Sequence, residues 1–337
     1  MRLYFYLAAF LLLAAHSTIA QKKQITLDDI WKDGTFRAER LQSIHSMANG
    51  SEYAVQNFDR ETRTGSVDIY SYVTGDKVRT AVNSNDIDSL DYFISYKFSP
   101  DERQVLLATK LKSIFRRSTL GEYYVWNPLS RKLTKVSDDL IQEPTFSPDG
   151  TKIAYGKENN LYVFDIASQT TKQFTFDGKK NSVINGITDW VYEEEFGFVR
   201  AFDWSADGKK IAYIRFDETN VPEFSMDVYG TELYQTQDVF KYPKAGEANA
   251  EVSVHVYTVD DATKGANIVK SQALSLKNAD AYYIPRIKWS NDADVVSIQV
   301  LNRHQNHLKL LLYNTKTNSV KQALRERDEA YVDVTDN

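Results

Sequence analysis

A short turn sequence recurs along this chain, and it constrains the fold more than any other feature. Each copy has an aromatic residue, a serine, a variable residue and an aspartate, sometimes followed by glycine. The copies lie at residues 98–101, 146–150, 204–208 and 289–292. In such a turn aspartate caps its own backbone, proline presets φ and glycine supplies a positive φ. Because an apolar strand follows each copy, the turn predicts the start of a β-hairpin.

A second short sequence alternates with this turn and predicts a short strand. Its copies lie at residues 67–70, 124–127, 162–165, 255–258 and 311–314. A polar turn and a further strand follow each copy. Short strands that recur every ~40–60 residues are typical of β-propeller blades. A β-sandwich is the alternative, but two templates in alternation disfavour it.

These repeats predict an all-β fold with about five blade-like units over residues 46–337. Extra sequence at about residues 220–250 predicts an inserted arm that leaves the propeller. The chain stops shortly after an outer hairpin without a closing strand, and an open end would expose a strand edge. We therefore expect residues 46–337 to be an incomplete β-propeller domain.

The N-terminus has the pattern of an export signal. Arg2 precedes an apolar run over residues 3–15, and small residues end at Ala20. This run fits a signal peptide at residues 1–20 better than a membrane span, which needs about 20 apolar residues; an uncleaved anchor is the alternative. An exported chain without cysteine suits a bacterial envelope protein. We expect a periplasmic or secreted protein with no stable membrane span.

Several kinds of site are disfavoured by the sequence. The formal net charge is −5 and no basic run stands out, so no nucleic-acid partner is expected. No Gly-x-Ser-x-Gly sequence or glycine-rich phosphate loop occurs, and the histidines lack metal-ligand spacing. We therefore expect no metal, no cofactor and no catalytic nucleophile in these 337 residues.

The strongest candidate for a binding site is the acidic stretch at residues 189–195. Three consecutive carboxylates, Glu193, Glu194 and Glu195, follow an aromatic and apolar run. Asp189 can cap a helix start and Gly197 can end it, so a short helix is predicted. Closely spaced carboxylates repel one another, which makes the stretch a candidate receptor for an ammonium group. A solvated acidic turn and a metal site are the alternatives.

The sequence around this stretch resembles a known family. Residues 185–195 read Asn-Gly-Ile-Thr-Asp-Trp-Val-Tyr-Glu-Glu-Glu, which is similar to the signature of the dipeptidyl peptidase IV family in the prolyl oligopeptidase superfamily. Residues 217–222 and 242–246 resemble the same family at the expected places. The likeness runs through most of the chain that follows the signal.

The resemblance implies an eight-bladed propeller and an α/β-hydrolase domain, C-terminal in the family and absent from this chain, that carries the catalytic Ser, Asp and His. It also implies that Glu194 and Glu195 bind the substrate's N-terminal ammonium, with Glu193 in support. Arg116 is the best match to the arginine that binds the carbonyl of the penultimate residue, although Arg117 lies one step away. Residues 21–45 would pack on the hydrolase domain, and the arm would contribute to a homodimer.

We therefore expect the substrate-recognition portion of an exported serine dipeptidyl peptidase. The whole enzyme would remove N-terminal dipeptides from peptides with a free N-terminus, preferring Pro or Ala at the penultimate position. The chain alone would be inactive. A free α-amino group has a pKa of about 8, so it is cationic at neutral pH and suits a receptor of two carboxylates. A non-enzymatic envelope propeller that binds peptides or proteins is the alternative.

Overall fold

The computed structural model describes residues 23–38, 43–59, 61–90, 92–259, 271–276 and 281–335. The chain divides into two units, Met1–Gln42 and Ser43–Asn337. The expected signal peptide at residues 1–20 lies outside the described residues. In the part of the chain that the structure describes, no helix is both long and apolar enough to cross a membrane.

The described part of the first unit contains a short π-helix, η1 (Asp28–Lys32). Asp29 organises this segment, because its carboxylate accepts hydrogen bonds from Lys23 Nζ at 2.6 Å and from Thr26 N at 2.9 Å. These hydrogen bonds, that from Lys23 first, hold the pKa of Asp29 well below its usual range.

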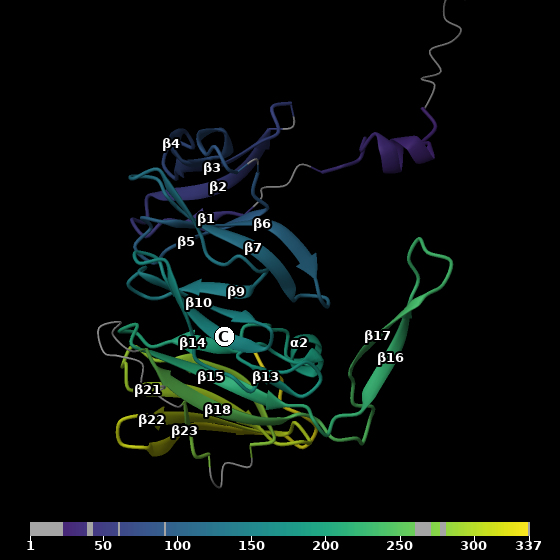
Figure 1. Cartoon of the computed structure of the whole chain (residues 1–337), viewed down its shortest axis with the longest axis vertical. Helices are drawn as coiled ribbons and strands as arrows, with labels where there is room; N and C mark the ends of the chain where they lie inside the picture. Colours follow the sequence, from purple (N-terminus) through teal and green to yellow (C-terminus); the bar gives the residue numbers. More distant parts are fainter. Residues whose placement is uncertain are drawn as a thin grey trace, which may run out of the picture. The chain divides into compact units, whose positions relative to one another are not determined.

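The second unit is built from antiparallel sheets that follow one another in chain order (Figure 1). Four of them are four-stranded and use consecutive strands. They are β1 (His45–Ser46), β2 (Glu52–Asp59), β3 (Thr64–Ser71) and β4 (Lys77–Asn83); β5 (Ser95–Phe98), β6 (Val105–Ser113), β7 (Thr119–Asn127) and β8 (Lys132–Lys135); β9 (Gln142–Phe146), β10 (Lys152–Lys157), β11 (Asn160–Asp165) and β12 (Thr170–Gln173); and β20 (Tyr283–Trp289), β21 (Val295–Leu301), β22 (His307–Asn314) and β23 (Ser319–Arg327).

A further sheet lies between the third and the last of these in the chain. It contains β13 (Val183–Asn185), β14 (Phe202–Trp204), β15 (Lys210–Asp217), β18 (Glu251–Thr258) and β19 (Gln272–Ala273). Between β15 and β18 the chain forms a separate hairpin, β16 (Glu223–Val228) and β17 (Thr236–Lys241), which we call the arm. Figure 1 shows it in green, projecting from its sheet. The all-β propeller prediction is confirmed, and the number of blades in a whole domain stays a prediction.

The recurring turns work as their residues predict. In the turn between β9 and β10, Ser147 Oγ donates to Asp149 Oδ1 at 2.6 Å and accepts from Lys152 N at 3.0 Å. Asp149 Oδ1 also accepts from Thr151 N at 3.1 Å, and Gly150 has φ of 68°. Each turn thus satisfies its own backbone donors and directs the chain into the next strand.

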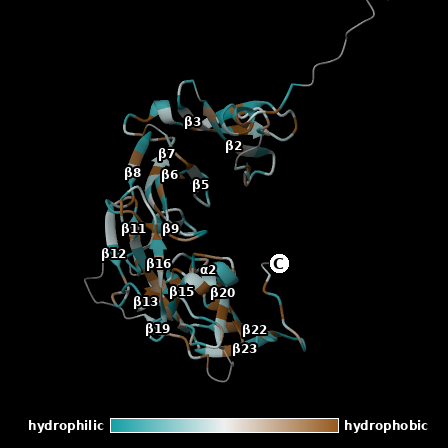
Figure 2. Ribbon diagram, turned by 90° about the vertical axis from the view of Figure 1, so that its right-hand side faces the viewer, coloured by the Kyte–Doolittle hydropathy of each residue, from teal (hydrophilic) through white to brown (hydrophobic). Residues whose placement is uncertain are grey.

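Hydrophobic side chains fill the space between successive sheets. One cluster joins the first two sheets through buried residues such as Ile69 of β3 and Leu107 of β6. Another joins the sheet of β15 to the last sheet, through residues such as Ile214 and Ile298. Figure 2 shows brown, hydrophobic segments along these strands. Burial of apolar area holds neighbouring sheets together, since different sheets share few backbone hydrogen bonds.

Candidate functional site

The acidic stretch forms the predicted helix, α2 (Trp190–Glu195), between β13 and β14. Asp189 caps its start, because Asp189 Oδ1 accepts a hydrogen bond from Tyr192 N at 2.9 Å. Gly197 follows the end of the helix with φ of 73°, a conformation that glycine adopts without strain.

The three glutamates of α2 have different surroundings. Glu193 is fully buried, Glu194 is partly buried and Glu195 is exposed. Neighbouring helical residues point about 100° apart, so three in a row face three directions. Only Glu194 and Glu195 are placed to meet a ligand from solvent.

Glu194 pairs with Arg116, which lies on the loop between β6 and β7. Arg116 Nε lies 2.8 Å from Glu194 Oε2 and 3.1 Å from Oε1. The Arg116 side chain is 71% exposed, and an ion pair this accessible contributes no more than about 1 kcal/mol. Among the described residues, no hydrogen bond is found for the two terminal nitrogens of Arg116. The pairing falls on Arg116 and not on its neighbour Arg117.

Glu193 reaches the same loop from the buried side of the helix. Its Oε1 accepts hydrogen bonds from Arg117 N at 2.5 Å and from Ser118 N at 2.9 Å. Its Oε2 is buried and has no hydrogen-bond partner among the described residues. Glu193 was expected to support the site, but no local pattern in the sequence predicts this contact with the loop.

Glu195 lines a cavity of about 340 Å³ on the exposed side of α2. Tyr283 and Arg303 line it as well. Arg303 donates to Glu247 O at 2.8 Å, and its guanidinium lies 5.1 Å from the centre of the Tyr282 ring. Neither Tyr283 nor Arg303 was predicted as a site residue, because no local motif in the sequence marks them.

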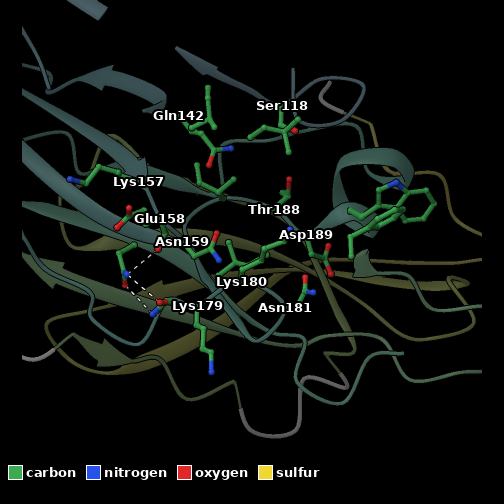
Figure 3. A pocket seen from close by; sticks show the side chains of 18 of the residues that line it. Ser118, Gln142, Lys157, Glu158, Asn159, Lys179, Lys180, Asn181, Thr188 and Asp189 are labelled. Atoms are coloured by element: carbon green, nitrogen blue, oxygen red, sulfur yellow. Dashed lines mark hydrogen bonds between the residues drawn. The ribbon is translucent and has the colours of Figure 1, made fainter. Parts of the chain in front are cut away.

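A larger cavity of about 670 Å³ lies beside the start of α2 (Figure 3). Figure 3 shows Thr188 and Asp189 across it from Lys157 and Glu158. Glu218 also lines this cavity and is buried. Burial raises the pKa of Asp189 to about 6, while burial and the nearby Asp189 raise the pKa of Glu218 to about 7. Glu218 was not predicted as a site residue from the sequence.

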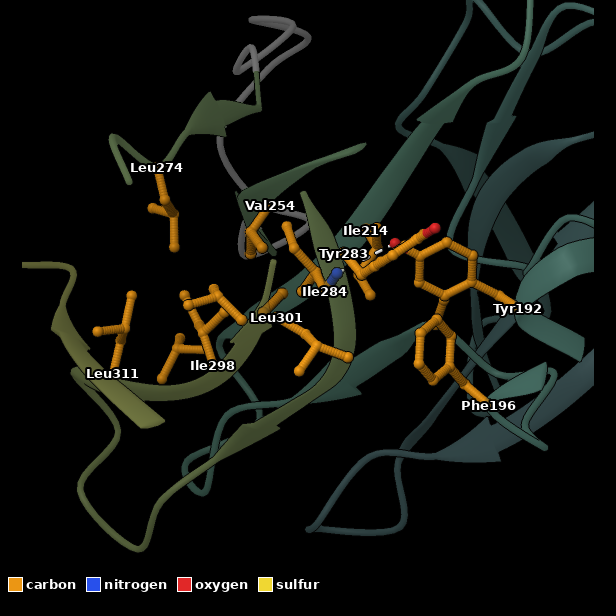
Figure 4. Packing of buried hydrophobic residues seen from close by; sticks show 14 of the residues in the cluster. Tyr192, Phe196, Ile214, Val254, Leu274, Tyr283, Ile284, Ile298, Leu301 and Leu311 are labelled. Atoms are coloured by element: carbon orange, nitrogen blue, oxygen red, sulfur yellow. Dashed lines mark hydrogen bonds between the residues drawn. The ribbon is translucent and has the colours of Figure 1, made fainter. Parts of the chain in front are cut away.

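Aromatic side chains fix α2 and the Arg116 loop in place. Tyr192 is buried, and its hydroxyl accepts a hydrogen bond from Ile284 N at 3.0 Å (Figure 4). The Trp190 ring packs against Tyr242 with centroids 4.3 Å apart. Phe115 of the loop packs against Phe240 of β17 at 5.7 Å, so the base of the arm supports the loop.

Comparisons with known proteins identify the family of this chain. The family model for the dipeptidyl peptidase IV N-terminal region matches residues 99–337. Human prolyl endopeptidase FAP is 31% identical over 288 residues, which are 84% of this chain and 36% of that protein. Mouse inactive dipeptidyl peptidase 10 is 30% identical over 236 residues, which are 67% of this chain and 29% of that protein.

The crystal structure of Porphyromonas gingivalis dipeptidyl peptidase 4 is similar with a TM-score of 0.82 and 36% sequence identity. The match covers 92% of this chain and 43% of that one. The chain therefore spans about a third of the length of the curated relatives it matches. The match to the family model, together with the repeated sheets and the acidic helix, shows that this chain belongs to the dipeptidyl peptidase IV family and corresponds to the N-terminal β-propeller region of that family.

Proposed function

We propose that this chain is the substrate-recognition portion of an exported serine dipeptidyl peptidase. The whole enzyme removes N-terminal dipeptides and prefers Pro or Ala at the penultimate position. The observation that carries the proposal is the meeting of Arg116 with Glu194 beside the exposed Glu195. A cation receptor and a donor for a carbonyl oxygen thus lie at one place.

Glu194 and Glu195 bind the substrate's N-terminal ammonium, which has three donors for carboxylate acceptors. Arg116 uses Nε to hold Glu194. Its terminal nitrogens then donate to the carbonyl oxygen of the penultimate residue. Two carboxylates at a fixed distance from the scissile bond admit chains whose N-terminus lies two residues away, and this positioning lowers the barrier to attack.

The attack itself uses a Ser-His-Asp triad on a hydrolase domain of the whole protein. The residues of this chain bind and orient the peptide, and this role needs no cofactor. Without the hydrolase domain, the chain is inactive. In the first unit, Leu27 and Trp31 are 74% and 82% exposed. Exposed apolar side chains of this kind support packing of residues 21–45 on the hydrolase domain.

The test is a kinetic comparison in the full-length protein. Glu194→Gln or Glu195→Gln should lower kcat/KM for an Ala-Pro chromogenic amide by about a hundredfold or more, because an acceptor for the ammonium is lost. N-acetylation of the substrate should abolish cleavage by the unchanged enzyme. Glu102→Gln is the matched control, since Glu102 lies on the turn between β5 and β6, at the other end of β6 from the Arg116 loop, and accepts from Ala48 N at 2.6 Å. Unchanged kcat/KM in both site variants would contradict the assignment.

A second candidate function is a non-enzymatic envelope propeller that binds peptides without cleaving them. The similarity to a relative named as inactive supports this second candidate, because that relative is a family member without the activity. A full-length sequence without a Gly-x-Ser-x-Gly motif, together with free-amine peptide binding that Glu194→Gln abolishes, would decide for this function.

A further inference from the structure

We propose that Glu193 is a positioning residue, which holds the loop of residues 114–118 so that Arg116 meets Glu194. The inference rests on the proposed function, because it concerns the same ammonium site. Glu193 is fully buried, so it does not touch substrate itself.

The contact joins two parts of the chain that are far apart in sequence. Arg117 N and Ser118 N both donate to Glu193 Oε1, across separations of 76 and 75 residues. Glu194 comes next on the helix, and Arg116 comes immediately before Arg117 on the loop. One carboxylate oxygen therefore fixes the backbone directly beside both members of the exposed ion pair.

The other contacts of the loop do not replace this one. The loop closes on itself through Ile114 N to Ser118 O at 2.9 Å, and Phe115 packs on Phe240 of the arm, but neither contact links the loop to α2. The exposed Arg116–Glu194 pair is too weak to order a loop by itself. The two hydrogen bonds from backbone N–H groups end on a buried carboxyl group, which protects them from solvent.

Burial of this carboxyl group is costly in one respect, because Glu193 Oε2 has no hydrogen-bond partner among the described residues. A role in packing alone gives no reason for such an oxygen, since an apolar side chain would avoid the cost. Hydrogen bonds accepted from the backbone N–H groups of the loop explain why a carboxyl group occupies this buried position. They also lead to a specific prediction for glutamine at position 193, because glutamine keeps an acceptor oxygen at the same distance from the backbone while it loses the charge.

Three variants of the full-length enzyme distinguish the effect of the position of the acceptor oxygen at residue 193 from the effect of its charge. Glu193→Gln should keep kcat/KM for an Ala-Pro chromogenic amide within about threefold of the unchanged enzyme. Glu193→Asp keeps the charge but withdraws the oxygen by one methylene, and it should raise KM about tenfold or more. Glu193→Ala should do the same. The effect should fall mainly on KM, as expected for a misplaced ammonium site.

Hydrogen–deuterium exchange provides a readout that does not depend on activity. The amides of Arg117 and Ser118 should exchange faster in Glu193→Asp and Glu193→Ala than in Glu193→Gln. Glu102→Ala removes a carboxylate acceptor for Ala48 N on the turn at the other end of β6, and it should leave exchange of this loop and KM unchanged. This control separates the loop contact from a general loss of stability.

A Glu193→Gln variant as impaired as Glu194→Gln, or a Glu193→Asp variant with unchanged KM and unchanged loop exchange, would overturn the inference. Failure of the proposed function has a different signature. In that case the unchanged full-length protein shows no cleavage that depends on a free amine, while the exchange experiment still reports whether Glu193 holds the loop.

Discussion

Two buried carboxyl groups lie beside the first turn of α2 and carry protons at an unusually high pH. Asp189 caps the helix and Glu218 lines the adjoining cavity. Burial is the main cause of their raised pKa values, about 6 and about 7. For Glu218 the charges of Asp189 and Asp217 act in the same direction, and Lys241 opposes them. Both groups therefore stay protonated over a pH range in which an unfolded chain would ionise them.

The difference between the folded and unfolded pKa values of these two carboxyl groups predicts a loss of stability as the pH rises. Because the folded pKa values lie above the unfolded ones, the stabilisation is complete below about pH 4 and is lost as the pH rises through about 6 to 7. Glu218→Gln cannot ionise, so at about pH 8 it should increase the free energy of unfolding by about 1–3 kcal/mol, with no increase at about pH 4. Urea unfolding at the two pH values measures this.

Asp217→Asn is an opposite-sign control for this prediction. Hydrogen bonds, with that from Thr219 the largest, lower the pKa of Asp217, so its charge stabilises the folded protein at neutral pH. This variant should lose stability at about pH 8, where Glu218→Gln gains it. An equal change for Glu218→Gln at both pH values would contradict the assigned burial effect.

At the scale of elements, α2 depends on the neighbouring sheet for its position. The helix has only six residues, too few to be stable by itself. The hydroxyl of Tyr192 links it to β20 by accepting from Ile284 N at 3.0 Å. Tyr192→Phe keeps the ring and leaves this buried N–H without its acceptor, so it should cost about 1–2 kcal/mol in denaturant unfolding.

Tyr313→Phe is the matched control for Tyr192→Phe. Tyr313 is also buried, but its hydroxyl is 3.4 Å from Asn318 Oδ1, which is a long and weak contact. The loss of stability should be clearly smaller than for Tyr192→Phe. Equal losses in the two variants would show that the link to Ile284 contributes nothing specific.

Elements that depend on local contacts could be predicted from the sequence. The turn of Ser147 and Asp149 closes on itself within a few residues, and α2 has its cap at Asp189 in the same stretch. Contacts that the fold creates could not be predicted. The bond of Glu193 to the Arg117 backbone spans 76 residues, and Glu218 meets Asp189 only after β15 has returned beside the helix. The family resemblance assigned Arg116 and Glu194 to one substrate site, but it did not predict the ion pair between them.

At the scale of the whole molecule, the arm exposes apolar side chains that its own sheet does not cover. Tyr229, Leu233 and Tyr234 at its tip are 79%, 89% and 78% exposed. Clustered exposed apolar residues mark interaction sites more often than isolated ones do. Through Phe240 and Tyr242, the base of the same hairpin touches the Arg116 loop and α2. This arrangement supports the proposal that the arm contributes to a homodimer.

The last prediction tests that proposal by oligomeric mass. Leu233→Asp places a charge where a dimer would bury an apolar side chain, so the full-length protein should change from dimer to monomer in light scattering. Leu129→Asp is the matched control, because Leu129 is 96% exposed on a turn far from the arm in sequence, and it should leave the mass unchanged. A Leu233→Asp variant that stays dimeric at micromolar concentration would place the interface elsewhere. Since the arm base supports the Arg116 loop, a monomeric variant should also show a higher KM for the Ala-Pro amide, whereas Leu129→Asp should not.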